Sequence, residues 1–360
     1  MKECLMKIVI LSISYHERRN DMKRPRIMFF IADTQGCGYY RVVQPAKGLK
    51  NWGYDVAISD IIPEKIDADI VVFQRQISSA VLKRALKMKE QGIKVVFELD
   101  DYYHGIPRNN PASAETENPF KQALKVLETF IHISDAFIVS THKLKEMYYR
   151  YNKNIHVIEN CVNPDLFEAI QKPKTDDKIT IGWYGSPTHL DDLKLVVNPL
   201  RKIVEANPNV VLKFFGYCPI SLFFDFPQKQ LSYSPPSDIF FFPFSLKNQD
   251  FTIGIAPLTT SDFNDCKSDL KWLEMSACKF PSIVSKCEAY KYVKNGITGL
   301  SVSSEKEWEE ALEYLVSNET KRLEIAKNAH DYVTEKRNIK HNIQEYSALL
   351  DSLVNQPALV

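Results

Sequence analysis

The sequence has no strong excess of charge of either sign. Its 46 Lys and Arg residues are matched by 45 Asp and Glu residues, so the formal net charge is +1 over 360 residues. A protein without a net positive field is not held on nucleic acid or acidic lipid by its overall charge. Long hydrophobic runs are also missing, because dense apolar stretches such as Ile239–Phe244 reach about six residues, whereas roughly 20 are needed to cross a bilayer. We therefore expect no membrane span.

Paired cysteines are also missing. The seven cysteines are odd in number, widely spread and never arranged as Cys-x-x-Cys. This usage is typical of reduced thiols and predicts a cytoplasmic protein without a structural zinc site or disulfides. The apolar segment Ile8–Ile13 follows Lys7 but has no small-residue cleavage site after it, so we expect a strand there and no signal peptide.

What the chain does contain is a regular alternation of strand-like and helix-like segments. Runs rich in Val, Ile and Phe separate amphipathic stretches, which is the pattern of parallel sheets covered by helices. In the first half the expected strands are Arg26–Ala32, Asp55–Ser59, Ile70–Gln74, Lys94–Glu98, Ala136–Ser140 and Ile155–Ile158. In the second half they are Ile179–Tyr184, Val211–Phe215, Phe251–Ala256 and Ser282–Ser285.

The fold class predicted from this alternation is α/β, with two tandem Rossmann-like doubly wound domains. A chain of 360 residues corresponds to about two domains of 100 to 200 residues. We expect a first domain over residues 1–170, a polar linker over 171–178, a second domain over 179–338, and a helix over 339–360 that packs back on the first domain. Open sheets of this kind bind ligands at the carboxyl ends of their strands, so a cleft between the domains is expected.

The first candidate site is a glycine turn after the opening strand. Gly36-Cys37-Gly38 precedes a helix carrying Val42 and Ala46. Glycine lets a backbone approach an anion closely, and the start of a helix points free N–H groups at it. The full dinucleotide fingerprint is absent, because Arg41 stands where its third glycine would be. An anion site and a tight turn without a ligand both remain open, and Arg41 is either a binding residue or a solvated helix residue.

The second candidate site is a set of charged residues with helical spacing. Lys267, Lys271 and Glu274 are four and three positions apart, which places them on one side of a helix. Lysines at a helix start beside a cleft can bind a phosphate, and a carboxylate further along can accept hydrogen bonds from sugar hydroxyls. The alternative is a ladder of ion pairs within the helix, which contributes little stability.

Six short motifs occur in an order typical of one enzyme family. They are Gly36-Cys37-Gly38, Asp135–Ser140, Val157–Asn163, Ile181–Ser186, Leu273–Pro281 and Val293–Leu300. Together they resemble the nucleotide-sugar-dependent glycosyltransferases of the GT-B fold, family 4, and the resemblance runs from about Arg26 to Asn338. It implies transfer of a sugar from a nucleoside diphosphate sugar to an acceptor hydroxyl, with retention of the anomeric configuration.

The resemblance also implies roles for individual residues. The catalytic residues would be Lys267, Asp100 and Glu274. The donor-binding residues would be Gly36, Gly38, Gly185, Ser186, Lys267, Ser268, Lys271 and Glu274, with Glu274 on the ribose. The acceptor side would carry Arg41, Asp101 and His104. No tightly bound cofactor and no metal are implied, since the nucleotide sugar is a substrate, and the adjacent Asp100 and Asp101 would then be a solvated loop pair.

The chain departs from the family pattern at several places. A glutamate that normally stands eight positions before Glu274 is Cys266 here. The arginine and lysine that normally hold the diphosphate are replaced by Ser186 and Asp192. The histidine of the fourth strand is missing, and Glu98–Asp101 occupies its region. These changes make Lys267 the best remaining candidate for the leaving diphosphate.

Other interpretations stay open. A sugar-nucleotide or carbohydrate-binding protein without catalysis is one alternative, and a GT-B epimerase is another. A phosphorylase is disfavoured, because no lysine motif for a pyridoxal cofactor is present. The acceptor is a glycan, a lipid carrier, a small molecule or a nucleic acid base. The basic segment 18–26 either binds a phosphate-bearing acceptor or is a solvated loop, and the aromatic run Phe240–Phe244 either forms an acceptor platform or, as we expect, packs in the core.

Overall fold

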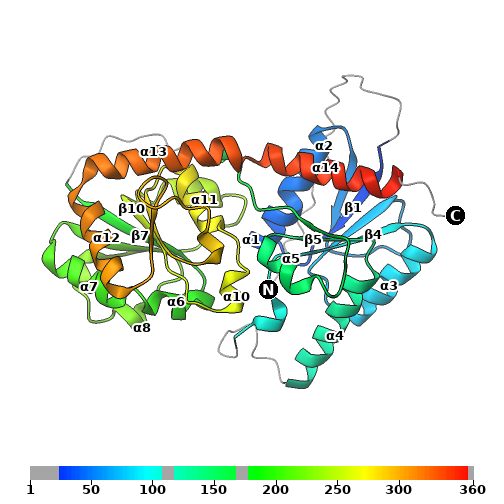
Figure 1. Ribbon diagram of the computed structural model, residues 1–360, viewed down its shortest axis with the longest axis horizontal. Helices are drawn as coiled ribbons and strands as arrows, with labels where there is room; N and C mark the ends of the chain where they lie inside the picture. Colours follow the sequence, from blue (N-terminus) through cyan, green and yellow to red (C-terminus); the bar gives the residue numbers. More distant parts are fainter. Residues whose placement is uncertain (1–23, 108–116, 168–176, 356–360) are drawn as a thin grey trace, which may run out of the picture.

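The computed structural model describes residues 24–107, 117–167 and 177–355. The strand expected at Ile8–Ile13, residues 18–23 of the basic segment and residues 171–176 of the linker lie outside these ranges. Two α/β domains stand side by side. Of the last two helices, the first runs along the second domain and the second along the first domain (Figure 1).

The first domain is built on a sheet of six parallel strands in the order β2-β1-β3-β4-β5-β6. The strands are β1 Arg26–Phe30, β2 Asp55–Ser59, β3 Ile70–Gln74, β4 Lys94–Leu99, β5 Ala136–Val139 and β6 Ile155–Val157. The helices are α1 Gly36–Gly38, α2 Gln44–Asn51, α3 Ser79–Glu90, α4 Glu117–Ile133 and α5 His142–Tyr148, and a π-helical segment η1, Tyr39–Val43, joins α1 to α2. All five residues of β3 are buried, as expected for a strand covered on both faces.

The second domain repeats this architecture with the order β12-β11-β10-β7-β8-β9. Its strands are β7 Ile179–Gly185, β8 Val210–Gly216, β9 Leu231–Ser234, β10 Ile253–Ala256, β11 Ser282–Ser285 and β12 Leu300–Val302. Its helices are α6 Leu190–Lys194, α7 Val197–Ala206, α8 Ile220–Phe223, α9 Phe242–Lys247, α10 Asp262–Asp265, α11 Leu270–Ala277, α12 Glu305–Ser317 and α13 Glu319–Lys336.

The two parallel sheets with their flanking helices confirm the predicted fold class. Every strand expected within the described ranges is present, with ends that differ by at most two residues. Two strands were not predicted, β9 and β12, and both lie at the edges of the second sheet.

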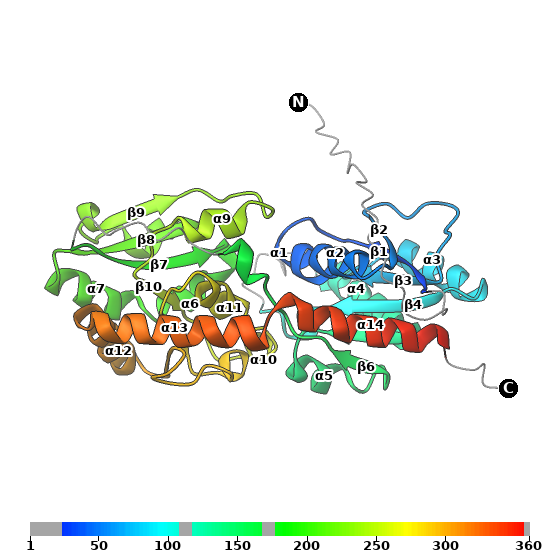
Figure 2. The same ribbon diagram turned by 90° about the horizontal axis from the view of Figure 1, so that it is seen from above.

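The C-terminal helix α14, Ile339–Asn355, crosses from the second domain to the first (Figure 2). It packs against α2, where a Cβ added to Gly48 would lie 2.2 Å from the Ile343 Cδ1 atom. The Tyr54 hydroxyl donates to Asp351 Oδ2 at 2.8 Å and lies 2.7 Å from the Ser347 hydroxyl. Because α14 follows α13 directly, one helical path ties both domains together.

Within the described ranges, no helix combines the length and the apolar content that crossing a membrane requires.

Candidate active site between the two domains

Each sheet has one point where its strand order reverses. In the first sheet this point lies between β1 and β3, and in the second sheet it lies between β7 and β10. Loops diverge at the carboxyl ends of such neighbouring strands and leave a crevice that commonly binds ligands. The site is therefore built from the residues that follow β1 and β3 in one domain and β7 and β10 in the other.

Gly185 and Ser186 end β7 at the second of these crevices. A Cβ atom on Gly185 would lie 2.9 Å from the Trp183 ring and 3.3 Å from the Lys271 ammonium nitrogen, so a side chain there would displace one of them. Ser186 is exposed, and its hydroxyl lies 2.7 Å from that of Thr188. The glycine therefore lets Trp183 and Lys271 pack closely against the end of β7.

Lys271 has no hydrogen-bond partner for its ammonium nitrogen within the described residues, although that atom is buried. The nitrogen lies 5.3 Å from the centre of the Trp183 ring. Burial, followed by repulsion from Lys267, lowers the pKa of Lys271 to about 8. A buried ammonium without an acceptor is costly, so this position favours an anionic ligand.

Lys267 precedes the first turn of α11 and faces the first domain. Its ammonium nitrogen lies 3.7 Å from Asp101 Oδ1 and 4.3 Å from the centre of the Phe263 ring. The helix starts later than the spacing suggested, at Leu270, but Lys267 is still close enough to Lys271 to lower its pKa. A cavity of about 650 Å³ opens beside Lys267 and is lined by Asp192 and Thr259 of the second domain and Pro107 of the first.

Glu274 lies between the domains and is not open to solvent. Tyr40 of η1 donates a hydrogen bond of 2.6 Å to Oε1, and the Tyr184 hydroxyl lies 2.7 Å from Oε2. The Tyr184 hydroxyl also lies 2.9 Å from the Lys271 carbonyl oxygen, which can only accept. The single hydroxyl proton of Tyr184 cannot be donated to both acceptors. A protonated Glu274 would donate to the Tyr184 oxygen, so that Tyr184 could donate its own proton to the Lys271 carbonyl. Consistently, burial raises the pKa of Glu274 to about 7.

Asp192 and His189 form a pair that the sequence did not single out as a pair. Asp192 Oδ2 lies 2.9 Å from His189 Nδ1, while Oδ1 accepts from the Thr259 backbone N–H at 2.8 Å and from the Asn264 side chain at 3.1 Å. Asp192 thus joins the loop after β7 to the loop after β10. The spacing His-x-x-Asp could have indicated the contact between His189 and Asp192. The contact of Asp192 with Thr259 arises only from the fold.

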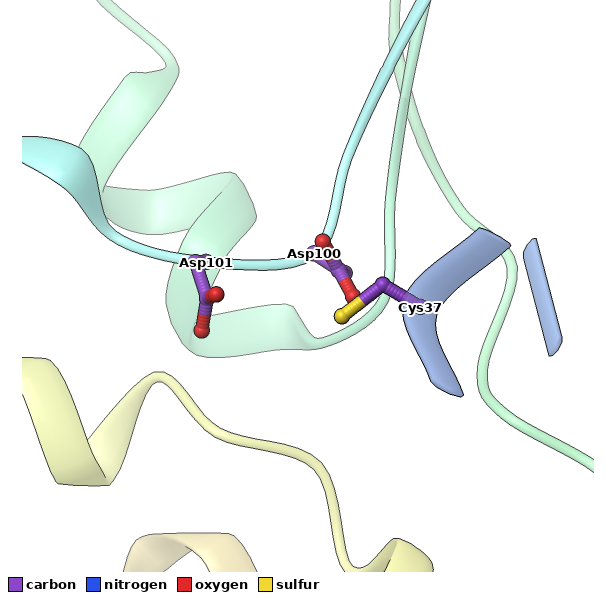
Figure 3. A group of neighbouring side chains, drawn as sticks. All are labelled: Cys37, Asp100 and Asp101. Atoms are coloured by element: carbon purple, nitrogen blue, oxygen red, sulfur yellow. The ribbon is translucent and has the colours of Figure 1, made fainter. Parts of the chain in front are cut away.

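The first domain presents an acidic cluster at its own crevice. Cys37, Asp100 and Asp101 bring one ligand atom each within 4.8 Å of one another. In Figure 3 the Cys37 sulfur and the Asp100 carboxylate turn toward each other, while Asp101 projects toward the second domain. Burial, followed by the Asp100 charge, raises the pKa of Cys37, so its thiol is protonated and a weak ligand at neutral pH.

Arg75, the residue that follows β3, provides the positive charge next to this cluster. Its guanidinium lies 3.8 Å from Asp100 Oδ1 and 3.6 Å from Asp33 Oδ2. Its φ of 54° is unusual for a residue with a side chain and is held at the strand crossover. Asp100 and Asp101 are only 11% and 26% exposed, so the solvated loop pair that we expected is a wrong interpretation.

The glycine turn after β1 is already occupied by a carboxylate. Asp33 Oδ1 accepts from the backbone N–H of Gln35 at 2.9 Å and of Gly38 at 3.4 Å. A Cβ on Gly38 would lie 1.8 Å from the Asp33 carbonyl oxygen, whereas one on Gly36 would meet nothing within 4 Å. Packing of the turn alone therefore explains the glycine at position 38.

Arg41 is neither a solvated helix residue nor open to an acceptor, because only 1% of it is exposed. Its guanidinium donates to Glu98 Oε1 at 2.6 Å, to the Ile158 carbonyl at 2.7 Å and to Asn160 Oδ1 at 2.9 Å. The acceptor contact that the resemblance implied for Arg41 is corrected to a buried role that fixes η1 against β4.

Two further expected site residues, His104 and Ser268, form hydrogen bonds with first-domain side chains. His104 Nε2 lies 3.0 Å from Glu128 Oε1, and its ring stacks on Tyr151 within the first domain. The Ser268 hydroxyl accepts a hydrogen bond of 2.8 Å from the Asn160 side chain. These contacts occupy His104 Nε2 and the Ser268 hydroxyl oxygen, while the buried Nδ1 atom of His104 has no hydrogen-bond partner within the described residues.

The aromatic run Phe240–Phe244 divides into two groups. Phe242 stacks on Phe215 and contacts Tyr184, as core packing predicts. Phe240, Phe241 and Phe244 are exposed, so our expectation of core packing was wrong for them.

No protein-family model and no curated protein sequence matches this chain. Its coordinates, however, are similar to those of several solved structures over nearly their whole length. HepE from Anabaena, in complex with UDP-glucose, has a TM-score of 0.68 at 11% identity and covers 91% of this chain and 100% of its own. Sucrose-phosphate synthase from Thermosynechococcus elongatus has a TM-score of 0.69 at 14% identity, with coverages of 92% and 99%. A glycosyltransferase from Rickettsia africae has a TM-score of 0.70 at 15% identity, with coverages of 93% and 100%. The chain therefore has the GT-B fold.

Proposed function

We propose that the chain is a glycosyltransferase that moves a sugar from a nucleoside diphosphate sugar to an acceptor hydroxyl. One observation carries the proposal. The buried ammonium of Lys271, which has no acceptor within the described residues, lies beside Gly185 at the strand crossover of the second domain. The GT-B fold and the UDP-glucose held by HepE support the same class of ligand.

In this proposal Lys267 and Lys271 bind the diphosphate and stabilise the negative charge that develops as the sugar leaves. The two ammonium groups repel each other, and a bound anion would offset this repulsion. Removing one preorganised donor of this kind commonly lowers the rate by about 10²- to 10³-fold. Lys267 would have to exchange Asp101 for phosphate oxygens when the donor binds.

Glu274 would bind the ribose hydroxyls of the donor. Because Tyr40 and Tyr184 already contact its two oxygens, donor binding would have to displace Tyr40, which belongs to the opposite domain. Asp100 and Asp101 would face the transferred sugar and the acceptor from the first domain. We propose retention of configuration on the family resemblance, and product analysis by NMR would test it.

The experiment that tests the proposal is a binding screen followed by a turnover assay. UDP-glucose, GDP-mannose, ADP-glucose and CMP-sialic acid are titrated while the melting temperature is recorded, since a ligand of the folded state raises it with the logarithm of concentration. A nucleotide sugar that raises the melting temperature is then tested for binding to Lys271→Met. Lys247→Met is the control, since Lys247 lies on α9 next to the exposed Phe244 ring.

We expect Lys271→Met to lose most donor affinity and Lys247→Met to keep it. Lys267→Ala should lower turnover by about 100-fold or more. A protein that binds none of these sugars, or a Lys267→Ala variant with full turnover, would contradict the proposal.

A binding protein without catalysis remains the second candidate, because the structure favours it at one point. Cys266, which replaces a family glutamate, is fully buried, and its carbonyl accepts a hydrogen bond of 3.0 Å from Thr141 of the first domain. Such a protein would bind the nucleotide sugar and never release free nucleotide, so coupled detection of nucleoside diphosphate separates the two candidates.

A further inference from the structure

His189 is the polar residue of this crevice that neither the family pattern nor the spacing of the lysines assigns. It ends the short helical turn Pro187–His189 that follows β7 and Ser186. Its Nδ1 atom faces Asp192 Oδ2 at 2.9 Å, and the side chain is 18% exposed. Nε2, on the opposite side of the ring, has no hydrogen-bond partner within the described residues.

Asp192 fixes the state of the ring. Burial opposes its ionisation, but hydrogen bonds from His189 and Thr259 outweigh burial and lower the pKa of Asp192. An ionised carboxylate can only accept, so His189 must donate from Nδ1. In the neutral ring the lone pair is then on Nε2, which becomes a donor only when the ring takes up a proton.

The charges around His189 keep it neutral in the absence of an anion. The ionisable groups that act on it are Asp192, Lys267 and Lys271, and Glu274 acts on Lys271 in turn. Burial, followed by the charge of Lys271, lowers the pKa of His189 to about 4. Asp192 raises the pKa of His189 through its hydrogen bond and its charge, but less than burial and the two lysines lower it.

A diphosphate would reverse the sign of this local potential. It would place at least two negative charges among two ammonium groups and an imidazole. An opposite charge within about 4 to 6 Å commonly shifts a pKa by 1 to 3 units, so two such charges are enough to protonate the ring near pH 6.

We propose that His189 is a diphosphate-binding residue that takes up one proton as the donor binds, with Nε2–H donating to a phosphate oxygen while Asp192 holds Nδ1. This proposal rests on the proposed function. In this chain His189 would take over the role of the arginine and lysine that hold the diphosphate in the family, whose positions are Ser186 and Asp192 here. His189 and Asp192 then form one unit, which explains an aspartate where the family has a lysine.

Calorimetry measures the proton directly. UDP-glucose, GDP-mannose and ADP-glucose are titrated at pH 6.0 in buffers with different ionisation enthalpies, and the slope of the observed heat against ionisation enthalpy gives the protons taken up. Diphosphate diesters have no group that titrates near pH 6, so the protein supplies the signal. We expect the wild type to take up at least about half a proton more than His189→Gln. Subtracting the variant removes contributions from Glu274 and Lys271.

Two replacements separate binding from structure. Asparagine keeps an N–H near the Nδ1 position for Asp192 but has nothing at Nε2, whereas glutamine reaches the Nε2 position and cannot titrate. Loss of a charge-assisted hydrogen bond should weaken binding by His189→Asn by roughly tenfold or more at pH 6.0. His189→Gln should lose less affinity. Because Lys271 and Glu274 titrate in both proteins, its affinity should still fall between pH 6 and 8, but less steeply than that of the wild type. His132→Gln, on the exposed surface of α4, is the control and should match the wild type.

The outcomes distinguish this inference from the proposed function. If no nucleotide sugar binds the wild type, the proposed function fails and the inference fails with it. If one binds but the wild type and His189→Gln take up the same number of protons, the function stands and the inference is wrong. It is equally wrong if His189→Gln lowers both affinity and melting temperature more than His189→Asn, since the Asp192 contact alone would then matter.

Discussion

At the scale of single residues, the buried Glu274 makes the stability of the protein depend on pH. Burial raises its pKa from 4.5 to about 7. Between these values the folded state binds a proton that the unfolded state has lost, so this stabilisation is fully present below pH 4.5 and disappears as pH rises through 7. The slope is about 1.4 kcal/mol per pH unit, or roughly 2 kcal/mol between pH 5.5 and 7.

Glu274→Gln tests this expectation, because glutamine keeps the shape and cannot titrate. Urea unfolding of wild type and variant at pH 5.5 to 8 should show a stability difference that changes with pH up to about 7 and then stays constant. Glu310→Gln, on the exposed face of α12, controls for the loss of one carboxylate. A difference that does not depend on pH would mean that Glu274 is ionised throughout.

The sequence placed Glu274 on one helix face with the lysines, opposite the buried face, but did not show what surrounds it. In the structure the helix starts after Lys267, and Glu274 is only 4% exposed. Tyr40 and Tyr184 are 234 and 90 positions away in the chain. No local pattern encodes such distant contacts, and the same is true of the link from Asp192 to Thr259.

At the scale of elements, the junction between α13 and α14 depends on one buried ion pair. Arg337 closes α13 and donates to both oxygens of Asp269 at 2.8 and 2.9 Å, and also to the Asn160 carbonyl. Arg337→Met would leave Asp269 buried and unpaired, so it should destabilise the protein by about 3 to 5 kcal/mol. Unfolding by urea measures the effect.

Two further variants make this prediction specific. Lys327→Met, on the exposed surface of the same helix, removes an ion pair with Asp331 and should change stability little. Adding Asp269→Asn to Arg337→Met should restore part of the loss, because no unpaired charge remains. A double variant as unstable as the single one would show that packing of Arg337 matters more than its charge.

The elements themselves were predictable where their sequence pattern is strong. Buried central strands such as β3 and β4 each contain three or four consecutive apolar residues, and the sequence predicted their ends almost correctly. The edge strands β9 and β12 have four and three residues and little periodicity, and they form because a neighbouring strand offers hydrogen bonds. In α9, Pro243 lies in the first turn and starts a short helix, which turns Phe244 outward in a segment that hydrophobicity alone had placed in the core.

At the scale of the whole molecule, polar contacts link the two domains near the cleft, beside a buried apolar cluster that contains residues of both domains. They include Tyr40 with Glu274, Thr141 with the Cys266 carbonyl, Asn160 with Ser268 and Asp101 with Lys267. Each contact involves a residue on or next to the proposed donor site, so binding and domain position should be coupled.

The contact between Asp101 and Lys267 allows a test of that coupling. In the ligand-free protein the Asp101 carboxylate, 3.7 Å away, partly neutralises Lys267, and a diphosphate must compete with it. Both side chains are about a quarter exposed, and such pairs contribute about 0.2 to 1 kcal/mol. Asp101→Asn should therefore raise the affinity for the nucleotide sugar by up to about fivefold at low salt. The gain should shrink at high salt, where the pair is screened.

Turnover should respond to Asp101→Asn in the opposite direction. If Asp101 faces the sugar and the acceptor as we propose, the variant binds the donor more tightly but transfers the sugar more slowly, so Kd and kcat both fall. Asp225→Asn removes a surface ion pair with Arg201 and should change neither quantity. Weaker donor binding by Asp101→Asn would mean that the carboxylate holds Lys267 in its binding position, and the first domain would then prepare the diphosphate site instead of competing with its ligand.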